Sequence, residues 1–148
     1  MIGFCVIIKT MEISEKQKRR IEEVARKYRL KLVLLFGSRV DGKTHKESDY
    51  DVAYLPSKNL SYDEEIDINS VFISIFPHKE GRIDTVDIRR VKPLLLFAIF
   101  TKCQVLFEQD HLIFPTYRAY AYKKYIEAKP LYEEKFRRLS EKIKNYDI

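Results

Sequence analysis

Cysteine is scarce in this chain, and its hydrophobic runs are too short to cross a membrane. Cys5 and Cys103 each lie in an apolar stretch without a second cysteine or a histidine at metal-ligand spacing. This predicts a reduced, cytoplasmic protein without a zinc site. The N-terminal run IGFCVII is seven residues long and lacks the basic region and cleavage site of a signal peptide, so we expect no membrane segment.

Low-complexity linkers and internal repeats are also absent, which favours a single domain over residues 1–148. Met11 immediately precedes a predicted helix start, so residues 1–11 are either an extra N-terminal segment or the result of a mis-assigned start. The chain has 28 Lys and Arg against 22 Asp and Glu, a net charge of +6. That balance suits an anionic partner such as a nucleotide, a nucleic acid or an acidic protein surface, without choosing among them.

Apolar periodicity and capping signals predict alternating helices and strands. We expect helices over 14–29 and 61–75, a helix opening near Pro93 and C-terminal helices over 116–148, and strands over 31–37, 49–55, 82–88 and 103–108. Residues 39–48 are predicted to be a loop, with a short helix after Ser38 as an option. Pro130 should kink or split the C-terminal helix. The fold class is α/β or α+β, with a small mixed sheet flanked by helices.

A carboxylate pair and a Gly-Ser pair are the candidate chemical groups. Because side chains alternate along a strand, Asp49 and Asp51 are predicted to share one face. Two carboxylates that close repel each other unless a cation lies between them, and Mg²⁺ commonly binds one or two carboxylates together with substrate phosphates. Gly37 allows a phosphate to approach the backbone, and Ser38 can donate hydrogen bonds to it.

The sequence Gly37-Ser38, ten residues, then Asp49-Tyr50-Asp51 resembles the GSx10DxD signature of the minimal nucleotidyltransferases of the DNA polymerase beta superfamily. The resemblance extends to MntA-type antitoxins and covers about residues 12 to 140. It implies a polymerase-beta-like fold with a C-terminal helical extension. It also implies a third carboxylate on a later strand, and the segment IDTVDI matches that pattern.

The resemblance favours Asp84 as this third carboxylate, whereas strand periodicity alone leaves Asp87 open. By resemblance, Asp49, Asp51 and Asp84 are catalytic and hold two Mg²⁺ ions, ATP is the substrate, and pyrophosphate leaves. Gly37, Ser38 and Arg39 form the nucleotide-binding loop, in which Arg39 either neutralises phosphate charge or is simply solvated.

Proteins of this size in the MntA-type group pair with HEPN ribonuclease toxins and transfer AMP to a toxin tyrosine. The resemblance therefore implies an AMP-transferring antitoxin with a HEPN partner, and direct nucleic-acid binding is not expected. One alternative is an antitoxin that acts by contact alone, through the long apolar stripe of residues 125 to 146. Another is a basic RNA-binding subunit, based only on charge and on a helix rich in tyrosine and lysine.

Overall fold

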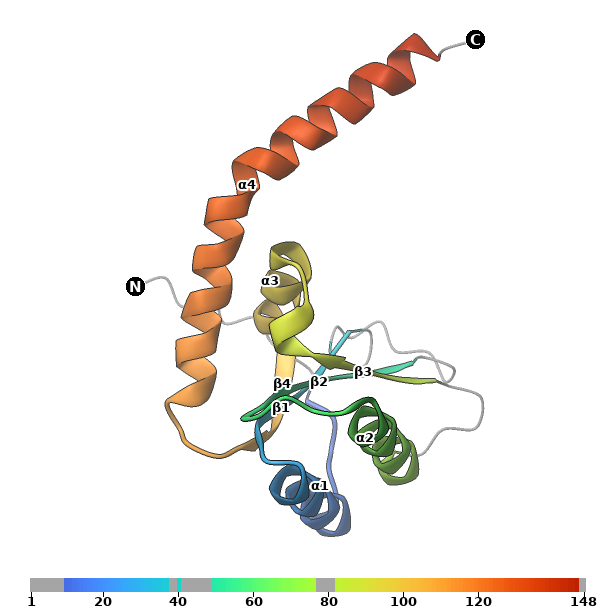
Figure 1. Ribbon diagram of the computed structural model, residues 1–148, viewed down its shortest axis with the longest axis vertical. Helices are drawn as coiled ribbons and strands as arrows, with labels where there is room; N and C mark the ends of the chain where they lie inside the picture. Colours follow the sequence, from blue (N-terminus) through green and yellow to red (C-terminus); the bar gives the residue numbers. More distant parts are fainter. Residues whose placement is uncertain (1–9, 38–39, 41–48, 77–81, 147–148) are drawn as a thin grey trace.

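The structure is a computed structural model that describes residues 10–37, 40, 49–76 and 82–146. These residues form a four-stranded sheet in the order β3-β2-β1-β4 (Figure 1). The strands are β1 (Leu30–Phe36), β2 (Tyr50–Pro56), β3 (Ile83–Asp87) and β4 (Cys103–Glu108). Strand β1 is antiparallel to both β2 and β4, while β2 and β3 are parallel. The predicted small mixed sheet is therefore confirmed.

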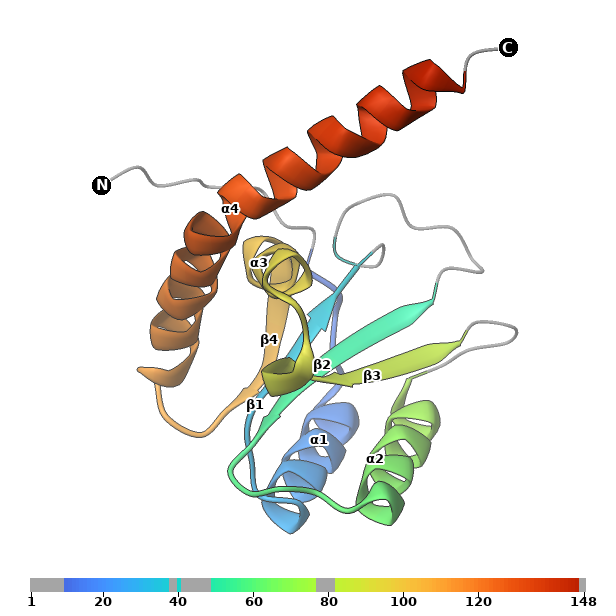
Figure 2. The same cartoon turned by 45° about the horizontal axis from the view of Figure 1, so that its top comes forward.

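Helices cover both faces of the sheet, as Figure 2 shows most clearly. One face carries α1 (Glu15–Lys27) and α2 (Tyr62–Ile75). The opposite face carries a 3₁₀ turn η1 (Ile88–Arg90), α3 (Pro93–Thr101) and the first half of α4 (Ile113–Asn145). The predicted capping box is present at α1, where Ser14 and Gln17 each accept a hydrogen bond from the other's backbone N–H. Such reciprocal capping satisfies two of the N–H groups that a helix start leaves unpaired.

Two apolar cores lie on opposite sides of the sheet because side chains alternate along each strand. The core under α1 and α2 contains Ile21, Val24, Val33, Leu35, Val52, Ile68 and Phe72 among others. The core under α3 and α4 contains Leu32, Leu34, Ala53, Leu55, Ile88, Leu96, Ile99 and Phe100 among others. Both faces of the central strands β1 and β2 are thus buried, which leaves their ends as the places where polar side chains can be presented.

Helix α4 departs from its predicted start and confirms one of the two predicted effects of Pro130. It begins at Ile113 rather than near residue 116, because the Phe114 N–H donates to Glu108 Oε2 at 2.7 Å. That carboxylate pairs one of the N–H groups that the first turn leaves without a partner. Pro130 lies inside one continuous helix, and Figure 1 shows the helix axis bending partway along its length. The helix is kinked but not split.

Several sequence predictions fall outside the described residues, namely Ser38, Arg39, the optional short helix of the loop and residues 1–9. Met11 is described, and its backbone N–H and C=O bond the side-chain amide of Gln104 on β4, each at 2.8 Å. This contact attaches the segment before α1 to the edge of the sheet. None of the helices among the described residues is both long and apolar enough to cross a membrane.

Candidate active site

Three neighbouring strands place one glycine and two carboxylates in a row across the sheet. Phe36, the last residue of β1, is the register partner of Asp51 on β2. Asp51 is in turn the register partner of Asp84 on β3. Register partners point to the same face of a sheet, so the carboxylates of Asp51 and Asp84 lie side by side, next to the point where the chain leaves β1 through Gly37.

Gly37 is in close contact with this carboxylate pair. Its φ is +83°, in the left-handed region where a residue with a Cβ atom is strained. A Cβ atom built at this position would overlap Oδ2 of Asp51. The backbone after β1 can approach the carboxylate of Asp51 only because residue 37 lacks a side chain; the predicted contact of Gly37 with a phosphate stays a prediction.

Asp51 is the electrostatic centre of the row. Burial, followed by the negative charges of Asp84 and then Asp49, raises its pKa from an ordinary value of 3.8 to about 6. Ionising Asp51 beside the other carboxylates is therefore costly in the absence of a cation. A bound divalent cation would offset the repulsion between the carboxylates and favour their ionised forms, so Asp51 and Asp84 fit a Mg²⁺ site of two carboxylates completed by substrate phosphates.

Asp49 differs from its predicted placement as a strand residue. It lies exposed just before β2, and its Oδ1 accepts a hydrogen bond from the backbone N–H of Arg82 at 3.0 Å. The Tyr50 N–H donates to the Arg82 carbonyl at 2.9 Å, so both contacts fasten the start of β2 to the start of β3. Within the described part of the chain, no three His, Cys, Asp or Glu side chains are preassembled as a metal site. Asp49 can keep its hydrogen bond through Oδ1 and still offer Oδ2 to a metal, because a carboxylate has two ligating oxygens.

The sheet register separates the two candidates for the third carboxylate. Asp84 is exposed and lies opposite Asp51, whereas Asp87 lies opposite Tyr54 at the far end of β3 and is only 5% exposed. Asp87 accepts hydrogen bonds from the backbone N–H, Nε and Nη2 of Arg89 at 2.9, 3.2 and 2.9 Å. It caps η1 and neutralises an arginine, which is a structural role.

Sequence reasoning missed two arginines that arrange these carboxylates. The backbone of Arg82 fixes Asp49, and the side chain of Arg89 holds Asp87. The second had a local signal, because an aspartate followed two residues later by an arginine in DIRR is a capping arrangement. The first had none, since Asp49 and Arg82 are separated by 33 residues.

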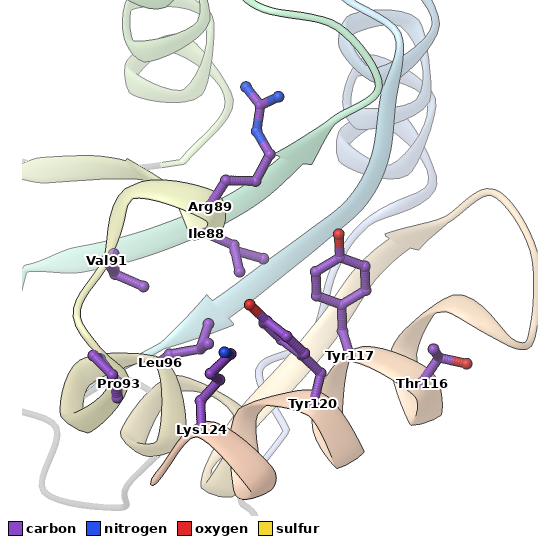
Figure 3. Close-up of a pocket in the computed structure, with 9 residues that line it drawn as sticks. All are labelled: Ile88, Arg89, Val91, Pro93, Leu96, Thr116, Tyr117, Tyr120 and Lys124. Carbon is purple, nitrogen blue, oxygen red and sulfur yellow. The ribbon is translucent and has the colours of Figure 1, made fainter. Parts of the chain in front are cut away.

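A separate recess of about 420 Å³ lies between η1, α3 and α4 (Figure 3). Its apolar wall includes Ile88 and Leu96, and Tyr117 and Tyr120 project into it from α4, with Lys124 beside them. None of the candidate carboxylates lines it. Its polar groups are hydroxyls and cations, so it lacks the carboxylates that usually bind Mg²⁺ in proteins.

Comparisons with known proteins agree with this geometry. The sequence profile described as polymerase beta, nucleotidyltransferase matches residues 19–112, more than half of the chain. No curated protein sequence matches significantly.

Solved structures share the fold over nearly their whole length. A chain of a toxin–antitoxin complex with AMP-PNP has a TM-score of 0.64 at 21% identity, covering 80% of this chain and 98% of that one. A chain of an MntA–HepT complex has a TM-score of 0.60 at 17% identity, covering 83% and 99%. A chain from a complex of the tri-AMPylated Shewanella oneidensis HEPN toxin with MNT antitoxin has a TM-score of 0.57 at 20% identity, covering 82% and 98%. At these identities the likeness is one of fold.

Proposed function

This chain belongs to the polymerase beta nucleotidyltransferase family, and we propose that it is a Mg²⁺-dependent antitoxin that transfers AMP from ATP to a tyrosine of a HEPN ribonuclease toxin. The observation that carries the proposal is the row formed by Gly37, Asp51 and Asp84 across three strands. It combines a backbone position without a side chain, Gly37, with two adjacent carboxylates. A site of this composition suits a triphosphate held through a divalent cation.

We assign each residue of the row a separate task. Gly37 gives the triphosphate access to the loop backbone, where Ser38 and Arg39 are the proposed hydrogen-bond donors. Asp51 and Asp84 would hold Mg²⁺, with Asp49 as a further ligand, and the bound metal would neutralise the triphosphate and lower the pKa of the attacking hydroxyl. Asp84, the more exposed of the two strand carboxylates, stands where an acceptor hydroxyl can approach from solvent.

The proposed reaction is an in-line displacement at the α-phosphorus of ATP. The phenolic oxygen of the acceptor forms a bond to this phosphorus while the bond to the bridging oxygen of the β-phosphate breaks. The tyrosine proton passes to a carboxylate or to solvent, and pyrophosphate leaves. The protein's contribution is positioning and charge stabilisation, because no covalent intermediate with the enzyme is needed.

A protein acceptor follows from what the chain contains beyond the family match. Beyond residue 112, the described residues form one long helix, α4, and a helix with an apolar face is a common means of binding a protein partner. Two solved relatives are described as a toxin–antitoxin with AMP-PNP and as a tri-AMPylated HEPN toxin with MNT antitoxin. These descriptions support a toxin acceptor, ATP as donor and, by extension, a cytoplasmic location.

Mass spectrometry of the separated toxin tests the proposal. A candidate cognate HEPN toxin is incubated with this chain, ATP and Mg²⁺, then purified under denaturing conditions and refolded. We expect AMP-sized mass increments on a tyrosine and a loss of ribonuclease activity that persists after this chain is removed. Asp84→Asn is the control that keeps the fold and should leave the toxin unmodified.

A second candidate function is inhibition by contact alone, which is favoured by the exposed apolar residues along the end of α4. It predicts an unmodified toxin that regains full activity on separation. That result would replace the transferase proposal.

A further inference from the structure

The apolar stripe of α4 runs on beyond the part of the protein that covers it. In the first half of the helix, Ala121 is buried, and Tyr117 and Tyr125 stack on Phe100 and Phe97. Just beyond this half, Tyr132 forms a hydrogen bond with the start of α3, in which its Oη accepts from the Leu94 N–H at 3.4 Å. Figures 1 and 2 show the remainder of α4 projecting away from the sheet and its helices.

Apolar side chains continue along this projecting part, here called the distal segment, residues 131–146. After Tyr132 they occur at alternating steps of four and three, which keeps them on one face of a helix. These residues, here called the seam, and their exposed fractions are Phe136 71%, Leu139 53%, Ile143 64% and Tyr146 79%. A helix in a stable assembly normally buries such a stripe against another element. The exposed seam therefore has the character of an interaction surface.

Beside the seam, the acidic side chains form ion pairs within the helix, whereas two of the lysines do not. The carboxylates of the distal segment are paired within the helix: Glu134 with Arg137 and Arg138 at 2.8 Å each, and Glu141 with Arg137 at 2.6 Å. Within the described residues, no carboxylate forms an ion pair with Lys135 or Lys142. These two lysines each precede a seam residue by one position and are seven residues apart, so they lie along the same flank.

A second copy of this chain is a poor match for that flank. Two identical antiparallel helices related by a two-fold axis place the same flank of each seam face to face, which would oppose Lys135 and Lys142 to their own counterparts. A parallel pair would place them against the flank of Glu133 and Ser140. Glu133 already lies 3.9 Å from Lys129, so this arrangement also offers little compensating charge.

We propose that the distal segment is a docking arm that binds a helical surface of the toxin carrying an apolar groove bordered by carboxylates. The inference rests on the proposed function, because it takes the HEPN toxin as the partner, and it names where that partner is held. The distal segment is 16 residues long, about 24 Å as a helix, which is long enough to lie along a groove with anchors on successive turns. Docking on an arm outside the row of carboxylates leaves Asp51 and Asp84 open to the acceptor tyrosine.

Binding of the purified toxin by the full-length chain tests the arm. Phe136→Ser combined with Ile143→Ser should weaken the complex at least tenfold, since buried apolar anchors dominate interface energies. Tyr62→Ser removes an aromatic side chain that is 76% exposed on α2 and should leave affinity unchanged. Lys142→Glu should weaken binding at least tenfold at low salt, whereas Lys144→Glu, in the same last turn but on the opposite face, should change it by less than threefold. The affinity for Mg-ATP should be the same in all variants.

The possible outcomes distinguish the docking-arm proposal from the proposed AMP-transfer activity. If the wild-type chain modifies the toxin but the seam variants bind as tightly as wild type, the arm is overturned and the proposed function stands. If the wild-type chain binds through the seam without modifying the toxin, the arm stands and the transferase fails. A wild-type chain that forms no complex with the toxin, a homodimer that depends on Phe136, or RNA binding lost in Lys142→Glu each overturns the arm.

Discussion

The backbone of Gly37 lies against the carboxylate of Asp51, so closely that a Cβ atom at residue 37 would overlap Oδ2. Gly37→Ala should therefore be destabilising for two reasons, the left-handed φ and the overlap, with a total cost of about 1–3 kcal/mol. The free energy of unfolding in urea measures this cost. Combining Gly37→Ala with Asp51→Ala removes the overlap but not the backbone strain, so the double variant should be less destabilised than the sum of the single effects. Simple additivity would show that the two groups do not meet.

Asp51 should make stability depend on pH. Its folded pKa of about 6 is above the ordinary value of 3.8, so its contribution to stability is fully present below about pH 4 and is lost as the pH rises through about 6. Asp51→Asn has no charge to lose, and its stability relative to wild type should rise by about 1 kcal/mol between pH 4 and pH 7, after solvent screening. Glu23→Gln on α1 is the matched control. The same rise in both variants would point to net charge rather than to this site.

Substitutions of Asp84 and Asp87 should have opposite effects: one should reduce AMP transfer and the other should reduce the stability of the fold. Asp84→Asn should leave urea unfolding nearly unchanged and reduce AMP transfer about a thousandfold or more. Asp87→Asn should do the reverse: it removes a buried charge held by Arg89, which should cost about 1–3 kcal/mol of stability, while transfer at a temperature where it stays folded should be mildly affected. A catalytic loss from Asp87→Asn in the folded protein would contradict this assignment.

Binding of ATP should depend on Mg²⁺, because the clustered carboxylates repel a free triphosphate. Calorimetric titration should show markedly tighter binding with Mg²⁺ than in EDTA. Asp51→Asn combined with Asp84→Asn should lose most of this difference and should bind free ATP at least as well as wild type does. Equal wild-type affinities in the two conditions would remove the basis for the metal site.

Most helices and strands were predictable from the sequence because their signals are local. A capping box predicts the start of α1, Pro93 predicts the start of α3, and short apolar runs or alternating apolar residues predict the strands. The segment that follows Asp49 alternates apolar and polar residues and predicted the strand β2, which begins at Tyr50 rather than at Asp49. The mixed sheet then followed from helices interleaved with strands, since such a chain buries both faces of its central strands.

Only the tertiary structure determined which residues from distant parts of the sequence come into contact. Periodicity could not choose between Asp84 and Asp87, because the choice depends on the register between β2 and β3, which is set by packing across the whole sheet. It could not show that Asp49 would accept a hydrogen bond from Arg82, 33 residues away. Nor could it show that only half of the α4 stripe is covered: a helical pattern predicts which face is apolar, but only the positions of the other elements determine what lies against that face.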